Sequence, residues 1–418
     1  MSLGILVAVG GVEFEPSLLR VAEAADIYVV RRCVDVADLL ATAASGQAQV
    51  AVVSAQLRGL DAEVVAQLAD SAVAVVGVTA DTLSADEALL RRLGISSVEA
   101  SDDVSAMAEA IREAVREPVR SQPEFGENGP GEAATSAEEG TPPGRIIAVW
   151  GPTGAPGRSV VSLSLSAELA RLGAPTLLID ADVYGGSIAP MLGILDESSG
   201  LLAAARAANL GALDAAGLAV HARQIAANLQ VLTGLPRADR WTEVKAVLFR
   251  TLLAVARRAH AFTVIDCGFN LELDEEISYD TAAPRRNGAT LEALGSADVV
   301  VVVGAADPVG LTRLIRGVNE VMTAVPGVVP HVLVNRARNG LGWSAQEVTQ
   351  MVVRATGLAA VRLLPDDPAA CDRALVHGQT LSECAPDAKL TRSFSALAAD
   401  IAGVPAPHAR RRSRLGRT

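Results

Sequence analysis

The chain has 418 residues, which at ~100–200 residues per domain predicts two or three domains. Half of the residues are hydrophobic, only 3% are aromatic, and the formal net charge of -12 argues against a protein that binds nucleic acid with its whole surface. The four widely spaced cysteines argue against a zinc or disulfide framework. With neither a secretory signal nor a hydrophobic run of ~20 residues, we expect a cytoplasmic protein.

Residues 1–117 alternate strand-like and helix-like patterns. The strand patterns lie at Ile5–Val9, Asp26–Val30, Gln49–Val53, Val73–Val78 and 95–98. The helical patterns between them lie at 16–24, 35–44, 60–68, 84–93 and 103–116. Such an alternation predicts a small, doubly wound parallel sheet.

This order of elements resembles a response-regulator receiver domain. In that family an acidic pair follows the first strand, a phosphate-accepting Asp ends the third, and a Lys follows the fifth. Here two glycines replace the acidic pair, Ser54 replaces the acceptor and Glu99 or a neighbour replaces the Lys, so that only Thr79 matches. We interpret this segment as a receiver-like module that lacks the phosphorylation residues and serves protein–protein docking or dimerisation. An unrelated flavodoxin-like domain is the alternative.

Two segments break these patterns. Residues 118–144 contain five Pro, five Gly and five Glu, a composition that predicts a disordered acidic linker. Residues 406–418 form a basic tail, in which Arg410–Arg417 is a candidate surface for anionic lipid or nucleic acid. The linker separates the first module from a longer segment, residues 145–405.

That longer segment begins with a hydrophobic strand at Arg145–Trp150, a Gly-rich turn and a helix at Val160–Leu172. Further strands are predicted at Thr176–Ile179, Leu229–Leu232, Phe262–Ile265, Val299–Val303 and His331–Val334. Helices are predicted at 242–258, 309–323, 344–355 and 387–402. The pattern predicts a second α/β domain with a mainly parallel sheet that is covered on both faces.

The turn after the first of these strands has the features of a phosphate-binding loop. Such a loop needs glycines, because consecutive backbone N–H groups must point into a tight turn at a helix N-terminus. Gly154 and Gly157 supply that freedom, and Ser159 stands where a hydroxyl ligates Mg²⁺. Arg158 replaces the usual Lys, and Pro152 replaces the first Gly. An ordinary Gly/Pro-rich turn is the alternative.

Polar side chains follow three of the later strands. Asp180 and Asp182 end the second strand of the segment, and Asp266 ends another. Carboxylates at the C-terminal ends of parallel strands beside a phosphate loop can hold Mg²⁺ and position an attacking water. Asn335 ends a further strand, where its amide could pair with an adenine edge.

Over residues 145–405 the sequence resembles the MinD/ParA family of deviant-Walker P-loop ATPases, whose loop Lys-Gly-Gly-x-Gly-Lys-Ser/Thr lies over residues 153–159. The resemblance implies that ATP is held by Gly154, Ala155, Pro156, Gly157, Arg158, Ser159, Val160, Asn335 and Arg336. It implies that Mg²⁺ is held by Ser159, Asp180 and Asp266. It also implies that Asp182 and Arg158 serve in hydrolysis.

A receiver-like domain before such an ATPase is the arrangement of CpaE/TadZ pilus-assembly proteins and of actinobacterial septum-site-determining proteins. The resemblance implies a homodimer that positions pilus-assembly or division machinery. The implied partners are a secretion ATPase or division proteins, with peripheral contact to the inner face of the plasma membrane at a pole or septum.

The loop departs from the family at Thr153, which lacks the charge and reach of the Lys that contacts the phosphates of the partner subunit. Arg158 keeps a positive charge, but its planar group is wider than an ammonium. We therefore predict nucleotide binding more firmly than hydrolysis. A non-hydrolysing scaffold of the same fold is one alternative, and a ParA-like DNA partition protein is another.

Overall fold

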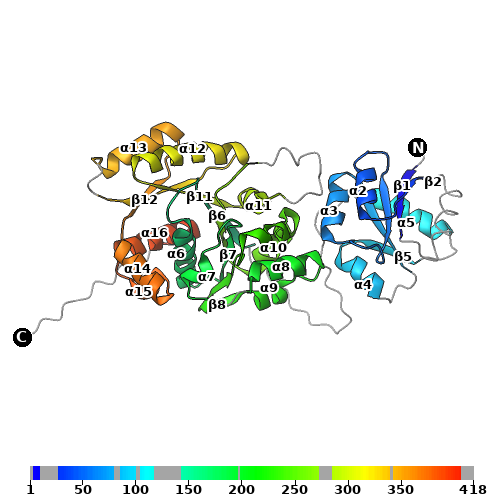
Figure 1. The fold of residues 1–418 in the computed structure, drawn as a ribbon, viewed down its shortest axis with the longest axis horizontal. Helices are drawn as coiled ribbons and strands as arrows, with labels where there is room; N and C mark the ends of the chain where they lie inside the picture. Colours follow the sequence, from blue (N-terminus) through cyan, green and yellow to red (C-terminus); the bar gives the residue numbers. More distant parts are fainter. Residues whose placement is uncertain are drawn as a thin grey trace, which may run out of the picture. The chain divides into compact units, whose positions relative to one another are not determined.

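The computed structural model describes residues 3–9, 27–79, 85–99, 104–116, 143–195, 198–272, 285–338 and 342–405. The chain divides into two compact units, one formed mainly by the residues before 140 and the other mainly by those from 140 onward (Figure 1). The predicted helix at 16–24, the tail 406–418 and all but the last two residues of the predicted linker lie outside the described residues.

The first unit contains one five-stranded parallel sheet of order β2-β1-β3-β4-β5. Its strands are β1 (Leu3–Ala8), β2 (Ile27–Arg32), β3 (Val50–Ser54), β4 (Ala74–Thr79) and β5 (Ser96–Glu99). Its helices are α2 (Val36–Ala43), α3 (Ala62–Asp70), α4 (Ala85–Arg92) and α5 (Val104–Arg116). This order is one of the common doubly wound arrangements.

Both faces of this sheet are buried. Along β1, Leu6 and Ala8 belong to one hydrophobic cluster, whereas Ile5 and Val7 belong to another, as the two-residue period of a strand requires. Ser54, which the receiver-like interpretation places at the phosphate-acceptor position, is buried, and its hydroxyl donates to the carbonyl of the residue that follows β1 at 3.0 Å. The receiver-like interpretation of this unit stays a prediction.

The second unit contains an eight-stranded sheet of order β13-β12-β11-β6-β10-β7-β9-β8, in which β8 alone is antiparallel to its neighbour. The strands are β6 (Arg145–Trp150), β7 (Thr176–Ala181), β8 (Arg223–Ala226), β9 (Leu229–Leu232), β10 (Phe262–Cys267), β11 (Val299–Ala305), β12 (His331–Ala337) and β13 (Val361–Pro365). The mainly parallel α/β fold that the sequence predicts is therefore confirmed. The sequence patterns missed β8 and β13, which lie at the two edges.

Single helices or runs of helices connect most of the strands of this unit. They are α6 (Arg158–Arg171), α7 (Ile188–Met191), α8 (Gly200–Asn209), α9 (Ala215–His221), the 3-10 helix η1 (Ala238–Glu243), α10 (Ala246–Ala259), α11 (Gly288–Ser296), α12 (Pro308–Ala324), α13 (Ala345–Thr356), α14 (Pro368–His377), α15 (Leu381–Cys384) and α16 (Lys389–Ala402). No helix within the described part of the chain is long and apolar enough to cross a membrane.

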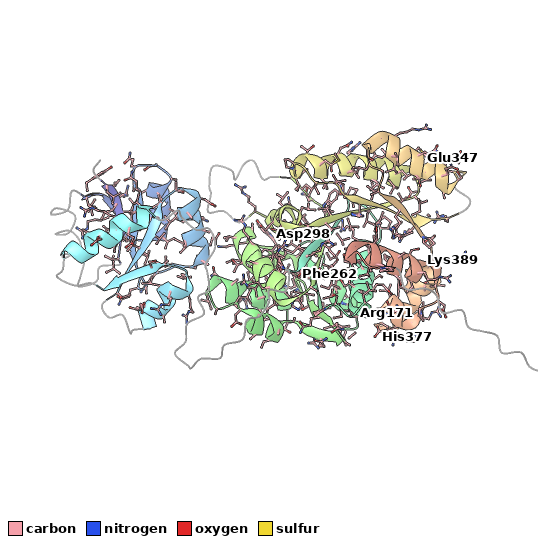
Figure 2. All side chains as sticks on the ribbon, turned by 180° about the vertical axis from the view of Figure 1, so that it is seen from behind. Arg171, Phe262, Asp298, Glu347, His377 and Lys389 are labelled. Atoms are coloured by element: carbon pink, nitrogen blue, oxygen red, sulfur yellow. The ribbon has the colours of Figure 1, made fainter. Side chains whose placement is uncertain are left out.

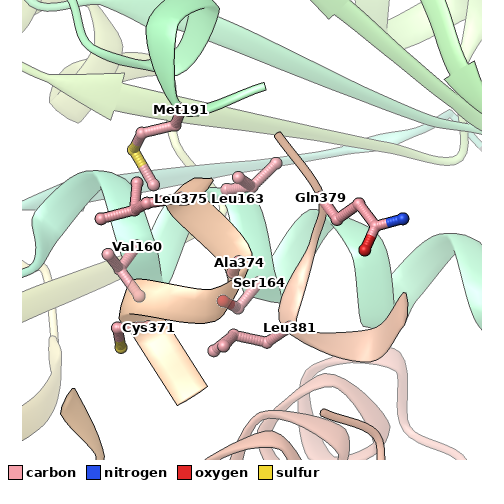
Figure 3. Close-up of a pocket in the computed structure, with 9 residues that line it drawn as sticks. All are labelled: Val160, Leu163, Ser164, Met191, Cys371, Ala374, Leu375, Gln379 and Leu381. Atoms are coloured by element: carbon pink, nitrogen blue, oxygen red, sulfur yellow. The ribbon is translucent and has the colours of Figure 1, made fainter. Parts of the chain in front are cut away.

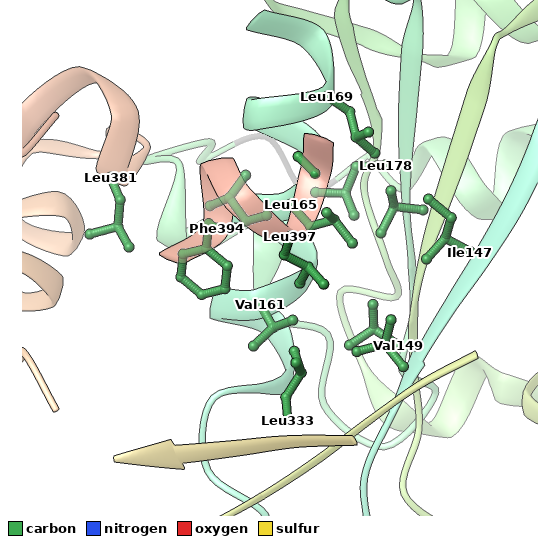
Figure 4. Packing of buried hydrophobic residues seen from close by; sticks show 14 of the residues in the cluster. Ile147, Val149, Val161, Leu165, Leu169, Leu178, Leu333, Leu381, Phe394 and Leu397 are labelled. Atoms are coloured by element: carbon green, nitrogen blue, oxygen red, sulfur yellow. The ribbon is translucent and has the colours of Figure 1, made fainter. Parts of the chain in front are cut away.

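The main core lies between the sheet and two helices. On α16, Phe394 and Leu397 are buried against Val161 and Leu165 of α6 (Figure 4). Phe394 and Leu397 are three residues apart and so lie on one face of α16, in the helix that the sequence predicts at 387–402. The core therefore fixes α6, the helix that follows the Gly-rich turn, between α16 and the sheet.

The start of β6 is fixed by a carboxylate. Asp298, labelled in Figure 2, accepts the backbone N–H of Ile146 at 2.7 Å and forms an ion pair with Arg257 at 2.8 Å.

Because β6 lies between β11 and β10, later strands occupy both of its sides. In open α/β sheets, ligands bind at the carboxyl ends of the strands where the strand order reverses in this way.

Candidate functional site

The Gly-rich turn joins β6 to α6 through two residues with left-handed backbone. Gly154 has φ 75° and Gly157 has φ 91°, conformations that residues with a Cβ rarely adopt. The backbone N–H of Ala155 donates to the carbonyl of Pro152 at 2.9 Å, which closes the turn. The local sequence folds in this way because only glycine adopts these two conformations without strain.

The N-terminus of α6 carries unused backbone donors. Gly157 is its N-cap, and no side chain among the described residues caps it. The first backbone bond of the helix runs from the N–H of Val161 to the carbonyl of Gly157 at 2.9 Å. The N–H groups of residues 158–160 therefore have no acceptor within the helix, and together with the helix dipole they form a site for an anion.

The side chain of Val160 faces away from this site. It lines a small pocket between α6 and α14, together with Leu163 and Ala374 (Figure 3). The pocket has a volume of about 20 Å³, which is room for about one water molecule. Any contribution of Val160 to ligand binding must come from its backbone N–H, and this pocket is not a nucleotide site.

Arg158 holds its charge beside the loop. Its Nη1 donates to the carbonyl of Gly151 at 3.0 Å, and its Nη2 forms an ion pair with Oδ2 of Asp182 at 3.2 Å. Both side chains are largely buried, at 16% and 11% exposure. The guanidinium also lies 5.9 Å from the ring centroid of Phe269. The two residues that the sequence predicted for hydrolysis are thus paired with each other.

Asp266, at the end of β10, lies beside α6. Its Oδ1 accepts the hydroxyl of Ser162 at 2.9 Å. The hydroxyl of Ser159, which accepts that of Ser187 at 2.8 Å, lies near the same carboxylate. Its Oδ2 is buried and has no hydrogen-bond partner among the described residues. Burial is the main cause that raises the pKa of Asp266 to about 6, while the two serine hydroxyls oppose that rise.

Asp180, at the end of β7, is already occupied by backbone donors. Its Oδ2 accepts the N–H of Ile188 at 3.0 Å, and its Oδ1 accepts that of Asp182 at 3.4 Å. A Cβ at Gly186 or Gly234 would lie within 2.9 Å of this carboxyl group, so the backbone encloses it closely. Burial and the charge of Asp266 raise its pKa to about 8. This geometry favours Asp266 over Asp180 as the carboxylate available to a cation.

The donor set fits Mg²⁺ only together with a phosphate ligand. Within the described ranges, no three His, Cys, Asp or Glu side chains are grouped so that they could hold a metal ion by themselves. Mg²⁺ commonly binds one or two carboxylates, substrate phosphates and water. The unpaired oxygen of Asp266 beside the hydroxyl of Ser159 meets that requirement at the start of α6.

Asn335, at the end of β12, contacts the loop itself. Its Nδ2 donates to the carbonyl of Pro156 at 3.0 Å, and a Cβ at Gly157 would overlap the same nitrogen. The side chain therefore supports the turn, and its predicted contact with a base stays a prediction. The neighbouring Arg336 is exposed and has a positive φ of 57°.

Two contacts of the loop and its helix were not predicted from the sequence. Ser162 lies three residues after Ser159, on the same side of α6. This helical spacing could have predicted that both hydroxyls lie near Asp266. Arg313 of α12 places its Nη1 3.4 Å from the carbonyl of Thr153. No local pattern links these two residues, because they are 160 positions apart in the sequence.

An aromatic and amide cluster joins the segments that follow β7 and β10. The hydroxyl of Tyr184 donates to Oδ1 of Asn287 at 2.7 Å, and its ring centroid lies 4.8 Å from that of Phe269. The guanidinium of Arg286 lies 4.1 Å from the centroid of the Tyr184 ring. The backbone N–H of Tyr184 donates to Asp182 at 2.9 Å, which connects the cluster to the loop.

Comparisons with known proteins find one family model and several solved structures that are similar to this chain. Residues 144–219 match the model of the ParA family, which is described as NUBPL iron-transfer P-loop NTPase. The fold is similar to that of a ParA family ATPase from Chlorobium tepidum TLS, with a TM-score of 0.51 and 15% identity over 61% of this chain and 98% of that one. No curated protein matches the chain.

Two MinD structures are also similar to the chain. The cell division ATPase MinD of Pyrococcus furiosus has a TM-score of 0.49 and 19% identity over 62% of this chain and 99% of that one. The septum site-determining protein MinD of Pyrococcus horikoshii OT3, complexed with Mg-ADP, has a TM-score of 0.48 and 19% identity. The match covers 62% of this chain and 95% of that one. The chain is thus similar to the ParA family model over residues 144–219, and its fold is similar to that of the ParA family ATPase from Chlorobium tepidum TLS.

Proposed function

We propose that the second unit binds ATP with Mg²⁺. The observation that carries the proposal is the uncapped N-terminus of α6, which follows two left-handed glycines and lies beside the buried guanidinium of Arg158. Backbone donors, a helix dipole and a fixed cation in one place are the requirements for a polyphosphate site. The match of residues 144–219 to the ParA model and the resemblance to ATPases favour adenine as the base.

In this proposal Ser159 and Asp266 hold Mg²⁺, and Asp180 is the buried carboxyl group next to Asp266. When bound, the metal would neutralise charge on the outer phosphates. The buried Oδ2 of Asp266 supports this role, since a buried acceptor without a partner costs free energy unless a ligand satisfies it. Asn335 would stabilise the observed conformation of the loop by donating to the carbonyl of Pro156.

We further propose that nucleotide state controls a homodimer that positions pilus-assembly or division machinery. The resemblance to MinD-like proteins with a preceding receiver-like domain supports this role, and the first unit would select the partner. In hydrolysis Asp182 would orient the attacking water, which requires it to leave its ion pair with Arg158. Loss of phosphate release in an Asp182→Ala variant would support this assignment.

A non-hydrolysing scaffold is the second candidate. The ion pair between Arg158 and Asp182 favours it, because both predicted catalytic side chains are engaged with each other. The absence of a Lys at Thr153 favours it too. Dimer assembly measured with ATP, with a slowly hydrolysed analogue and without nucleotide separates the candidates: a scaffold assembles equally in the first two conditions and releases no phosphate.

The direct test of the proposal is a titration of the full chain with a fluorescent adenine nucleotide, with and without Mg²⁺. We expect saturable binding that Mg²⁺ tightens, and a loss of about tenfold or more in an Arg158→Ala variant. Arg354→Ala, an exposed arginine on α13, is the matched control and should bind as the wild type does. A wild-type chain that shows no saturable binding at millimolar nucleotide would falsify the proposal.

A further inference from the structure

Helix α12 approaches the Gly-rich turn closely. A Cβ at Gly317 would lie 3.1 Å from Cγ of Pro152 and 3.1 Å from the ring of Trp150, so the helix backbone packs directly on the start of the turn. The Pro that departs from the loop pattern is therefore part of this contact. Arg313 lies four residues before Gly317, on the same helix face. The packing of Gly317 on Pro152 therefore places Arg313 beside the turn.

The guanidinium of Arg313 lies against the middle of the turn, at Thr153 and Gly154. Its Nη1 lies 3.4 Å from the carbonyl of Thr153, and a Cβ at Gly154 would overlap that nitrogen. Arg158 binds the carbonyl of Gly151 at 3.0 Å, only two residues earlier in the same turn. Two guanidinium groups from distant elements therefore flank one loop.

The loop itself provides little positive charge for a polyphosphate. Arg158 is its one cation between residues 151 and 159, and Asp182 neutralises it in part. A nucleoside triphosphate brings several negative charges, which charge-assisted bonds to arginine stabilise well. Arg313 is exposed and its bond to Thr153 is long, so the guanidinium can turn from that carbonyl to a phosphate at small cost.

We propose that Arg313 is a second phosphate ligand, which binds the terminal phosphate of a nucleoside triphosphate and makes the site prefer a triphosphate to a diphosphate. The residue in the position of Arg158 reaches the outer phosphates in loops of this kind, and Arg313 borders the same turn. The inference rests on the proposed function. It adds a residue that selects the nucleotide state.

The test compares ATP and ADP, each with Mg²⁺, by competition against a fluorescent adenine nucleotide on the full chain. In the Arg313→Ala variant we expect ATP affinity to fall by about tenfold or more and ADP affinity to change by less than about threefold. Arg313→Lys should recover part of the preference. Arg316 is an exposed arginine on the same helix, so Arg316→Ala is the matched control. This variant should keep the wild-type preference for ATP over ADP.

The outcomes separate the two proposals. Equal losses for ATP and ADP would show that Arg313 only clamps the turn, and no change for either would show that it does not reach the ligand; both results overturn this inference alone. A wild-type chain that binds neither nucleotide overturns the proposed function and this inference together. If Arg313→Ala does not fold, Arg313→Gln keeps donors without the charge and gives the same comparison.

Discussion

At Gly157 one backbone conformation decides the geometry of the site. Its φ of 91° places the residue in the left-handed region, and the space where a Cβ would stand is taken by Nδ2 of Asn335. The carbonyl of the same residue starts α6 by accepting the N–H of Val161. A side chain at this position would strain the turn and displace the amide that supports it.

We therefore expect Gly157→Ala to destabilise the second unit by about 1–3 kcal/mol and to weaken nucleotide binding. Urea unfolding and the fluorescent titration measure the two effects. Gly173→Ala is a matched control, because Gly173 has a similar φ of 88° but open space around its Cα. Equal losses of stability in the two variants would contradict a steric role for Asn335.

His260, at the end of α10, gives a pH dependence at the residue scale. Its Nε2 lies 2.8 Å from Oε1 of Gln230, its Nδ1 is buried without a partner among the described residues, and burial lowers its pKa. The folded protein thus resists a proton that the unfolded chain accepts below about pH 6.5. The stability contributed by the neutral ring is present above that pH and is lost as the pH falls through the folded pKa.

We expect His260→Gln to reduce the acid sensitivity of the second unit, because glutamine does not titrate. Thermal unfolding at about pH 7.5 and about pH 5.5 should show a smaller fall in melting temperature for the variant than for the wild type. An identical fall in both proteins would mean that this ring does not contribute to the pH dependence.

At the scale of elements, α16 determines how firmly α6 is held. Phe394 is 1% exposed and packs in the core shared by these helices and the sheet. Phe394→Ala should cost about 3–5 kcal/mol, since it removes a large buried ring and leaves a cavity. Arg392→Ala, an exposed position on the same helix, should leave urea unfolding nearly unchanged. A loss below about 1 kcal/mol for Phe394→Ala would indicate that the site collapses around the cavity.

The sequence predicted the central elements better than the peripheral ones. Strands such as β11 are continuous hydrophobic runs because both faces of a parallel sheet are buried, and this pattern is visible without a structure. Edge strand β13 is only partly buried, so its residues lack that pattern. The two short helices α14 and α15 were missed because four to ten residues give little periodicity.

The predicted site could be assembled from the sequence only in part. The order of strand ends placed Arg158, Asp182 and Asp266 near one loop, and they lie there. The sequence could not show that Arg158 would pair with Asp182, because that pairing depends on side-chain geometry. It could not show Arg313 either, since the approach of α12 depends on the packing of Gly317 against Pro152.

At the scale of the whole molecule, the two units have separate hydrophobic cores. We therefore expect calorimetry of the full chain to resolve two unfolding transitions. ATP with Mg²⁺ should raise the melting temperature of the second unit only. The expected gain in its unfolding free energy is about 2.7 kcal/mol at a hundredfold excess of ligand over the dissociation constant. The Phe394→Ala variant identifies that transition. A nucleotide that shifts both transitions equally would mean that the units unfold together.

The cluster around Tyr184 has a mechanical consequence. Its backbone is bonded to Asp182, its hydroxyl to Asn287 at the start of α11, and its ring rests on Phe269, which also faces Arg158. If Arg158 turns toward a bound anion, it releases Asp182 and withdraws from Phe269 in one movement. Asp182 and Phe269, the two residues that Arg158 would leave, are both contacts of Tyr184, so anion binding at the turn would be coupled through Tyr184 to the beginning of α11.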